Sequence, residues 1–402
     1  MTTNPISGPS TAAKRRRRPF AALWAVLTLA GVLAGCDKAD IEAALNPKPA
    51  TTTTTTTPVR KHQNRAPSTS VPSASPTTVL DVGTPAPTSP SPTSPGPTSP
   101  TPTTPGATTP PTTAPATNPG TGCSAVPSRC GYPDATNSGV PAGTTLKRVP
   151  EDISSGPGWT VDPRGWIQVD TAGTVIDGIT TKLSVEIFAN NVTVKNSVIQ
   201  VGFDDWAVAV RHVAGAVVDH NTLRATNGTS QRGMVGVKTI YGDERNTTVT
   251  ANNISNFSNG VQIYSGLIQD NYIHDMGYVS GDHVNGTTSN GGVTDQLNIL
   301  HNTVFNQYGQ TDAISLFEDF GVEANRRIEN NLVAGGGYTI YGGANPGGSQ
   351  TSNIKITGNR FSRMFFPNSG SYGPATAFDR NGPGNVWSGN LWDDTGATLP
   401  AP

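Results

Sequence analysis

The segment from residue 274 to 285 gathers side chains that are suited to acid–base catalysis. Its polar members are His274, Asp275, Asp282, His283 and Asn285. A histidine that a carboxylate orients can take up or release a proton near neutral pH, as a general base or acid must. We therefore predict that His283 is catalytic and that Asp282 or Asp275 orients it. The alternative is that His283 is a turn residue with only a structural hydrogen bond.

A second aspartate, Asp312, follows about one repeat after Asp282. Neighbouring strands lie about 4.8 Å apart, so carboxyl groups on adjacent repeats can lie close together. Such a pair supplies the acid and the base or nucleophile of a glycosidase. The same oxygens suit Ca²⁺, which leaves calcium open as a cofactor. The predicted catalytic set is Asp282, His283, Asn285 and Asp312.

Other side chains are predicted to contact the substrate. A uronate lyase needs a cation beside the carboxylate, a base and an acid; Lys238, Arg326 or Arg327 are candidates for the cation, and a tyrosine for the acid. Glu318 and Asp319 either bind substrate or are solvated loop charges. The predicted substrate-binding set is Lys238, Tyr264, His274, Asp275, Glu318, Asp319 and Tyr341. Both hydrolase and lyase chemistry remain open.

A recurring sequence motif, an asparagine followed two residues later by an apolar residue, defines the repeats that must position these side chains. Successive asparagines are separated by 19 residues (Asn252 to Asn271) to 31 residues (Asn271 to Asn302). A recurrence in this range is typical of a stacked solenoid, and the spacing is too short for propeller blades. The copies begin at Asn196, Asn221, Asn252, Asn271, Asn302, Asn330, Asn359 and Asn390.

Short alternating runs such as Val192–Val194 surround each asparagine, and no sustained helical stripe appears. The pattern predicts an all-β, right-handed parallel β-helix. Asparagine tolerates the left-handed backbone of a sharp corner, and its amide can bond to the asparagine of the next repeat. Outward side chains would then line a groove suited to a linear polymer. We expect one outward column to contain Arg211, Lys238, either Gln262 or Tyr264, the pair His283 and Asn285, either Ser315 or Phe317, and Tyr341. Val284, between His283 and Asn285, should point inward.

The stretch from Gly131 to Leu146 resembles the opening segment of many secreted bacterial β-helix proteins. The resemblance implies the pectate-lyase-like superfamily, which includes pectate lyases, polygalacturonases, alginate epimerases and non-catalytic surface proteins. Gln310-Thr-Asp312 and Gly281-Asp-His283 are loosely similar to polygalacturonase motifs, but the basic tripeptide of that family is missing. The chain is therefore predicted either to cleave a polysaccharide or to be a non-catalytic surface lipoprotein that binds a cell-wall glycan or acts as an adhesin.

The amino terminus is predicted to direct export and anchoring. Basic residues 14–18 precede an apolar run at 20–33, and Leu33-Ala-Gly-Cys36 resembles the bacterial lipobox. We expect residues 1–35 to be a lipoprotein signal peptide, Cys36 to carry the lipid, and the protein to be extracellular on the bacterial cell membrane. The alternative is an ordinary export signal.

Composition divides the remaining chain. Residues 36–120 are rich in Thr, Pro and Ser, which predicts a disordered spacer. Cys123 and Cys130 are predicted to form a disulfide in an entry segment and amino-terminal cap at 121–165, before a β-helix domain at 166–402. From residue 121 onward, 17 Lys and Arg stand against 24 Asp and Glu. This acidic balance argues against nucleic-acid binding, and we expect a monomer.

Overall fold

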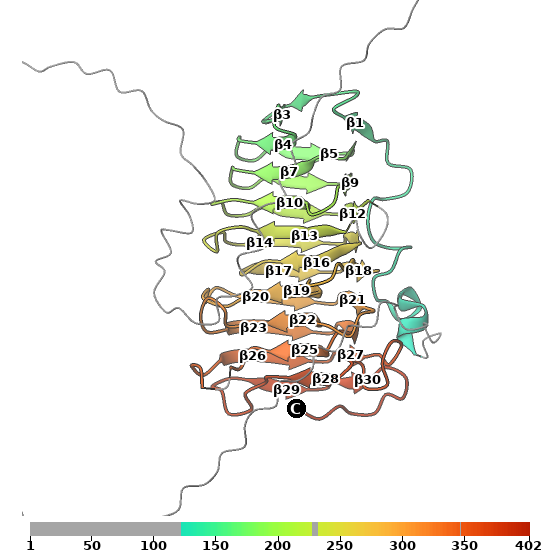
Figure 1. The fold of residues 1–402 in the computed structure, drawn as a ribbon, viewed down its shortest axis with the longest axis vertical. Helices are drawn as coiled ribbons and strands as arrows, with labels where there is room; N and C mark the ends of the chain where they lie inside the picture. Colours follow the sequence, from blue (N-terminus) through green and yellow to red (C-terminus); the bar gives the residue numbers. More distant parts are fainter. Residues whose placement is uncertain (1–121, 227–231, 346) are drawn as a thin grey trace, which may run out of the picture. The chain divides into compact units, whose positions relative to one another are not determined.

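A parallel β-helix forms the part of the chain that the computed structural model describes, residues 122–226, 232–345 and 347–402. The predicted signal peptide, Cys36 and spacer lie outside these residues. Each repeat contributes one short strand to each of three sheets, which run along the stack (Figure 1). The predicted β-helix is thus confirmed. Among the described residues, no helix is long and apolar enough to span a membrane.

The three sheets are called A, B and C. Sheet A contains β1 (Lys147–Val149), β6 (Ile179–Thr181), β9 (Val198–Val201), β12 (Thr222–Ala225), β15 (Asn253–Ser255), β18 (Tyr272–His274), β21 (Thr303–Asn306), β24 (Leu332–Gly335), β27 (Arg360–Phe361) and β30 (Leu391–Trp392). Sheet B contains β2 (Ser155–Gly156), β3 (Trp159–Asp162), β4 (Trp166–Val169), β7 (Ser184–Ile187), β10 (Trp206–Val210), β13 (Gly233–Thr239), β16 (Phe257–Gln262), β19 (Asn285–Ser289), β22 (Asp312–Leu316), β25 (Tyr338–Gly342) and β28 (Gly373–Thr376). Sheet C contains β5 (Val175–Asp177), β8 (Thr193–Lys195), β11 (Val217–Asp219), β14 (Thr247–Thr250), β17 (Gly266–Gln269), β20 (Leu297–Leu300), β23 (Ala324–Glu329), β26 (Ser352–Thr357) and β29 (Val386–Ser388).

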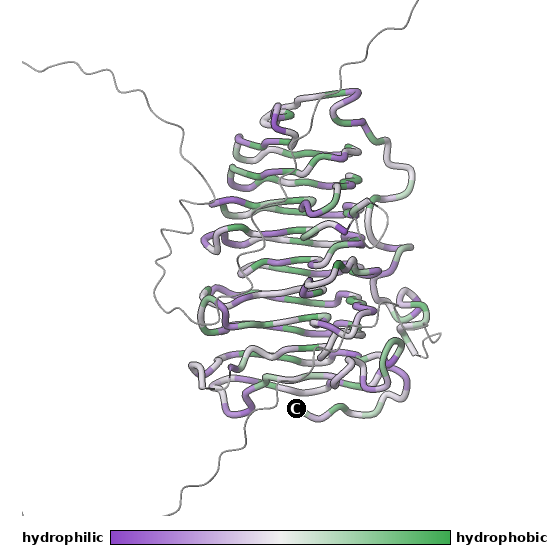
Figure 2. The backbone as a smooth tube through the Cα atoms, viewed as in Figure 1, coloured by the Kyte–Doolittle hydropathy of each residue, from purple (hydrophilic) through white to green (hydrophobic). Residues whose placement is uncertain are grey.

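Columns of stacked apolar side chains fill the interior. The strand period of two turns the middle residue of each short strand inward, and apolar positions recur along the tube in every repeat (Figure 2). Each fully buried aliphatic side chain contributes roughly 1.5–3 kcal/mol. The column of sheet C is Val194, Val218, Val249, Ile268, Ile299, Ile328 and Ile356. That of sheet A is Ile199, Leu223, Ile254, Ile273, Val304, Val333 and Phe361.

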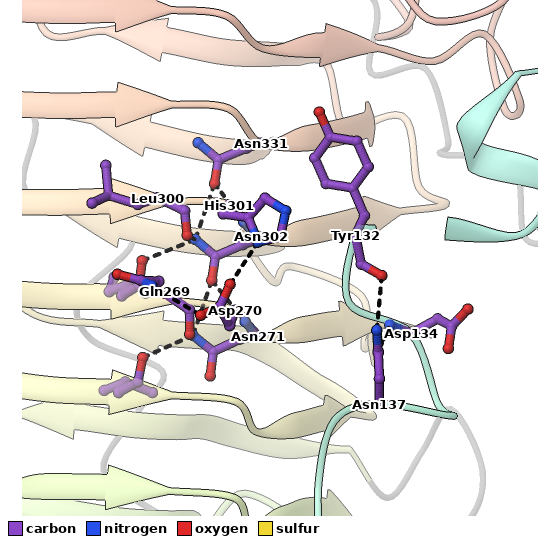
Figure 3. A network of polar contacts seen from close by, with 12 residues as sticks. Tyr132, Asp134, Asn137, Gln269, Asp270, Asn271, Leu300, His301, Asn302 and Asn331 are labelled. Carbon is purple, nitrogen blue, oxygen red and sulfur yellow. Dashed lines mark hydrogen bonds and ion pairs between the residues drawn. The ribbon is translucent and has the colours of Figure 1, made fainter. Parts of the chain in front are cut away.

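An asparagine ladder runs along the corner between sheets C and A (Figure 3). Asn302 donates from Nδ2 to Asn331 Oδ1 at 3.0 Å and accepts from Asn271 Nδ2 at 2.9 Å. Its members are Asn221, Asn252, Asn271, Asn302, Asn331, Asn359 and Asn390, all fully buried. The predicted amide stacking is confirmed, but Asn331 takes the place expected for Asn330, and Ser197 stands where Asn196 was expected.

The left-handed corner residue is the one before each ladder asparagine, not the asparagine itself. Asn196 and Asn330 have φ values of 48° and 55°, and His301 before Asn302 has 52°. The two tasks that we assigned to one asparagine are therefore divided between neighbours. One residue makes the turn, and the next satisfies the buried polar groups.

Residues 122–146 form a strap along sheet A, in the direction opposite to the growth of the solenoid (Figure 1). The strap starts with Cys123 N donating to Asp393 Oδ1 in the last repeat, at 3.1 Å. It then passes Ala251, whose carbonyl accepts from Gly139 N at 2.8 Å, and reaches β1 in the first repeat. This part of the predicted cap is therefore not at the open end.

The two ends of the solenoid are covered by other segments. At the amino-terminal end, β2 and β3 extend sheet B as antiparallel strands, and Trp159 is buried in the core. At the carboxyl-terminal end, Trp387 Nε1 donates to Leu399 O at 2.9 Å, and the Leu399 side chain is buried. Trp387 and Leu399 thus cover this end of the solenoid.

Candidate functional site

The outer face of sheet B aligns several of the predicted substrate-binding residues. Lys238 pairs with Gln262, and Ser315 pairs with Tyr341, in consecutive steps of one register. The predicted sharing of a column by these four is confirmed. Thr288, however, occupies the repeat where His283 and Asn285 were expected, and Ala209 occupies the place expected for Arg211. The complete column is Gln168, Glu186, Ala209, Lys238, Gln262, Thr288, Ser315, Tyr341 and Thr376.

The displaced register has a packing cause. Thr287 pairs with the core residues Val261 and Ile314, and the preceding Gly286 also faces the core. A Cβ added to Gly286 would lie 2.2 Å from Val304 Cγ1, a core atom of sheet A. Two inward residues in succession break the strict alternation that sequence reasoning assumes. Val284 is buried in the core, as predicted.

One end of this outer face is cationic and aromatic. The Arg211 guanidinium contacts Glu186 Oε2 at 2.5 Å, and Trp206 Nε1 donates to Glu186 Oε1 at 2.6 Å. Lys238 makes no ion pair with the described residues. Burial lowers the pKa of Lys238, and the charge of Arg211 lowers it further, while Glu244 opposes the shift. Lys238 is thus a partly buried cation that could accept a ligand anion.

Tyr264 supports this end of the face from the next repeat. Its hydroxyl accepts from Gln262 Nε2 at 3.3 Å, and burial raises its pKa. Its side chain is almost fully enclosed. Tyr264 therefore fixes the Gln262 amide beside Lys238 and offers little surface of its own to a substrate.

The other end of the face opens into a pocket of about 880 Å³. It brings together three predicted residues, Glu318, Asp319 and Tyr341. Sequence reasoning missed a further carboxylate and two aromatic residues, Asp379, Tyr338 and Phe378. None of the three carries a periodic signal. Tyr338 lies three residues before Tyr341, and residues three apart on a strand point to opposite faces. Asp379 and Phe378 come from the next repeat and the loop after it.

Aromatic rings make one wall of this pocket. The ring centroids of Phe317 and Tyr341 are 5.2 Å apart, and those of Tyr338 and Tyr341 are 5.7 Å apart. Tyr372 packs against Tyr338 at 5.8 Å and is 72% exposed. Burial raises the pKa of Tyr341 to about 12, with a further contribution from the Asp312 carboxylate. The Tyr341 hydroxyl is therefore neutral over the physiological range and can donate a hydrogen bond.

Asp312 is buried beside these tyrosines, where no solvent reaches it. It lies opposite Asn285 on β19, so the expected pairing with the Asp282 carboxylate is wrong. Burial raises the pKa of Asp312 well above its usual range, and the Ser315 hydroxyl only partly opposes this. The carboxyl group is not part of the pocket lining.

The predicted orientation of His283 by an aspartate is also wrong. Asp282 accepts two hydrogen bonds from Arg232, at 2.6 Å from Nε and 2.5 Å from Nη2. His283 is exposed, and its Nδ1 lies 3.3 Å from Thr311 Oγ1. Arg232 also contacts Asp204, so Asp282 belongs to a structural ion-pair network rather than to a catalytic dyad.

His274 and Asp275 lie at the end of β18 in sheet A, away from the column of sheet B. His274 Nδ1 is 2.8 Å from Asp275 Oδ2, and its Nε2 is 3.0 Å from Asn253 Oδ1. The His274 ring stacks on Tyr272 with centroids 3.9 Å apart. The fold thus separates this pair from Lys238 and Tyr341, because successive polar residues fall on different sheets of one repeat.

The alternative cations also lie elsewhere. Arg326 is fully buried and bonds to Glu323 and to three backbone carbonyls. Arg327 pairs with Glu329 on sheet C at 2.5 Å. Within residues 122–226, 232–345 and 347–402, no three His, Cys, Asp or Glu side chains come together as metal ligands. Lys238 is therefore the predicted cation that the outer face of sheet B retains.

The Cys123–Cys130 disulfide is present, as predicted.

Comparison of the chain with protein-family models, curated proteins and solved structures gave no match.

Proposed function

We propose that the outer face of sheet B binds a linear polysaccharide, with the pocket beside Tyr338 and Tyr341 at one end of the site. The observation that carries this proposal is the combination of aromatic rings with Glu318, Asp319 and Asp379 in one pocket. The apolar C–H faces of sugar rings pack on aromatic side chains, while carboxylates accept hydrogen bonds from sugar hydroxyls.

The common register of the two ends supports a polymer as ligand, which would pass over the buried Thr288 and Ser315 between them. Lys238, Thr288 and Tyr341 belong to one column across five strands, about 4.8 Å apart. A chain lying along the stack would meet the pocket at one end and the Lys238 cation at the other. An acidic glycan would satisfy that cation, whereas a neutral glycan would leave it unpaired.

Affinity electrophoresis of the full chain against plant, algal and bacterial wall glycans tests the proposal. We expect Tyr341→Ala to weaken the retardation by the bound glycan at least tenfold, because its ring and hydroxyl both line the pocket. Phe203→Ala removes another exposed aromatic residue outside the pocket and serves as the matched control. No retardation by any glycan, or equal effects of both variants, would sink the proposal.

A second candidate function is hydrolysis of the bound glycan. Three carboxylates in one pocket include enough groups for an acid and a base or nucleophile. We expect new reducing ends without unsaturated uronyl products, and their loss in Glu318→Gln or Asp379→Asn. Release of unsaturated products would instead identify a lyase. Binding without any product would identify the non-catalytic alternative.

We also propose that the chain is a lipid-anchored member of the pectate-lyase-like superfamily, exported by residues 1–35 and acylated at Cys36. The supporting observations are the lipobox-like Leu33-Ala-Gly-Cys36 and the parallel β-helix. Metabolic labelling with a palmitate analogue in a bacterial host tests the anchor. Labelling that disappears in Cys36→Ser is expected, and equal labelling of both proteins would contradict it.

A further inference from the structure

The first eleven described residues form a hook, Gly122–Tyr132, on the last repeats of sheet A. Two very short 3₁₀ turns, η1 (Cys123–Ala125) and η2 (Pro127–Cys130), make up most of it. Turns of three or four residues are not stable alone. The disulfide joins the start of the first turn to the end of the second. The hook therefore depends on this bond and on its contacts with the solenoid.

Those contacts centre on one buried carboxylate, Asp393, while at the other end of the hook the Tyr132 ring stacks on His301 with centroids 5.2 Å apart. Asp393 accepts from Cys123 N at 3.1 Å and from Ser124 N at 2.9 Å. Ser362 Oγ donates to Ser124 Oγ at 2.7 Å in the preceding repeat. Asp393 is only 4% exposed, so these bonds are shielded from water. They place the start of the described chain at the carboxyl-terminal end of the solenoid.

The hook also covers apolar surface outside the main core. Cys123 and Tyr132 form a separate buried cluster with sheet A residues. The covered residues are Phe305, Leu332 and Ala334, with Tyr272, Met364 and Phe365 packed at the margin. Without the hook, these side chains would form an exposed apolar patch.

The next fixed point along the strap lies several repeats away. Gly139 N donates to Ala251 O at 2.8 Å, and Val140 N donates to Thr222 Oγ1 at 3.3 Å. This position adjoins β15, five strand spacings before β30 in sheet A. At about 4.8 Å per spacing, the two fixed points are about 24 Å apart along the stack.

We propose that the Cys123–Cys130 disulfide is a redox latch that sets where the preceding chain leaves the solenoid. In the oxidised protein, that chain leaves at Gly122 beside Asp393. Reduction releases the hook, moves the exit point to Gly139 and uncovers the apolar patch around Phe305. The inference is independent of what the outer face of sheet B binds.

The reductant in this proposal is a dithiol. Its thiolate attacks Cys130, which is the exposed partner, whereas Cys123 is only 7% exposed. The sulfur–sulfur bond breaks, and the Cys123 sulfur leaves as a thiolate that takes up a proton. The second thiol of the reductant then displaces Cys130, so that two electrons and two protons reach the protein and the dithiol becomes a disulfide.

Hydrogen exchange of the full chain, with and without dithiothreitol, tests the latch. We expect amides of residues 123–132 to exchange roughly 30- to 100-fold faster after reduction, because the closed loop no longer restricts the released state. Amides of β19, β22 and β25 should keep their rates. Unchanged exchange in the hook, or equal acceleration in all repeats, would overturn the proposal.

A variant separates release of the hook from loss of the bond. Asp393→Ala in the oxidised chain should accelerate exchange at Cys123 and Ser124, since both lose their acceptor. Asp394→Ala is the matched control, because Asp394 pairs with Arg363 at the surface and does not contact the hook. The double variant Cys123→Ser/Cys130→Ser should reproduce the reduced pattern without dithiothreitol. Equal effects at positions 393 and 394, or an oxidised pattern in the double variant, would contradict the latch.

Discussion

Asp312 on β22 lies directly opposite Asn285 on β19, and both residues are buried. Neither carboxyl oxygen of Asp312 nor Oδ1 of Asn285 makes a hydrogen bond of normal geometry with a described residue. A protonated Asp312 could donate to Asn285 Oδ1, whereas an ionised one could not. This relationship makes the protonation of Asp312 a determinant of stability.

Asp312→Asn should stabilise the protein at neutral pH. Burial raises the folded-state pKa of Asp312 above its unfolded value of 3.8. The contribution of Asp312 to the free energy of unfolding is therefore fully present below about pH 4, and it is lost as the pH rises towards the folded-state pKa. At pH 7 the amide avoids that loss, and we expect a gain of about 1–3 kcal/mol in urea unfolding. The gain should shrink at pH 4; a gain independent of pH would contradict this assignment.

The asparagine ladder should be sensitive to a single interruption. Asn302→Ala removes the side-chain donor of Ile268 O and the acceptor of the Asn271 backbone N, and it also removes the bonds to Leu300 O and from Asn271 Nδ2. Each unsatisfied buried group costs about 1–3 kcal/mol, so a loss of several kcal/mol is expected in urea unfolding. Asn298→Ala is the control, because that side chain bonds only to Gln296 at the surface. Similar losses in the two variants would show that the ladder position is not special.

Two adjacent arginines provide a matched test of burial. Arg326 is fully buried with Glu323, whose pKa burial raises even though Arg326 opposes the shift. Arg327 forms a more exposed pair with Glu329. We expect Arg326→Ala to cost about 3–5 kcal/mol and Arg327→Ala at most about 1 kcal/mol, both measured by thermal and urea unfolding. The reverse order would contradict the role of burial.

Lys238 should set the preference for acidic glycans. Lys238→Gln removes a charged hydrogen bond worth about 1.5–3 kcal/mol, so affinity for an acidic glycan should fall roughly 10- to 100-fold. Affinity for a neutral glycan should change little. Burial and Arg211 lower the pKa of Lys238 below 10.5, the usual pKa of lysine. As the pH rises, wild-type binding of the acidic glycan should therefore begin to weaken before pH 10.5 is reached. Lys355→Gln on sheet C is the control variant. Calorimetry measures the glycan affinities of all three proteins.

The repeating architecture could be predicted because its causes are local and periodic. Alternating apolar residues bury one side of each strand, and a polar amide at each corner must bond to the next repeat. These rules gave the ladder and the shared column of Lys238, Gln262, Ser315 and Tyr341. They misplaced Asn285 because Gly286 and Thr287 both face the core. A strictly alternating strand would place only one of two successive residues there.

The sequence by itself determined the stacking of the strands, the cysteine pairing and the place of Lys238 and Tyr341 in one column. Only the tertiary structure decided that Asp282 binds Arg232, that Asp379 joins Glu318 in a pocket, and that the strap starts beside Asp393. Those contacts join loops or segments up to 270 residues apart. No periodic pattern fixes such contacts, because loop paths and long-range packing depend on the whole assembled solenoid.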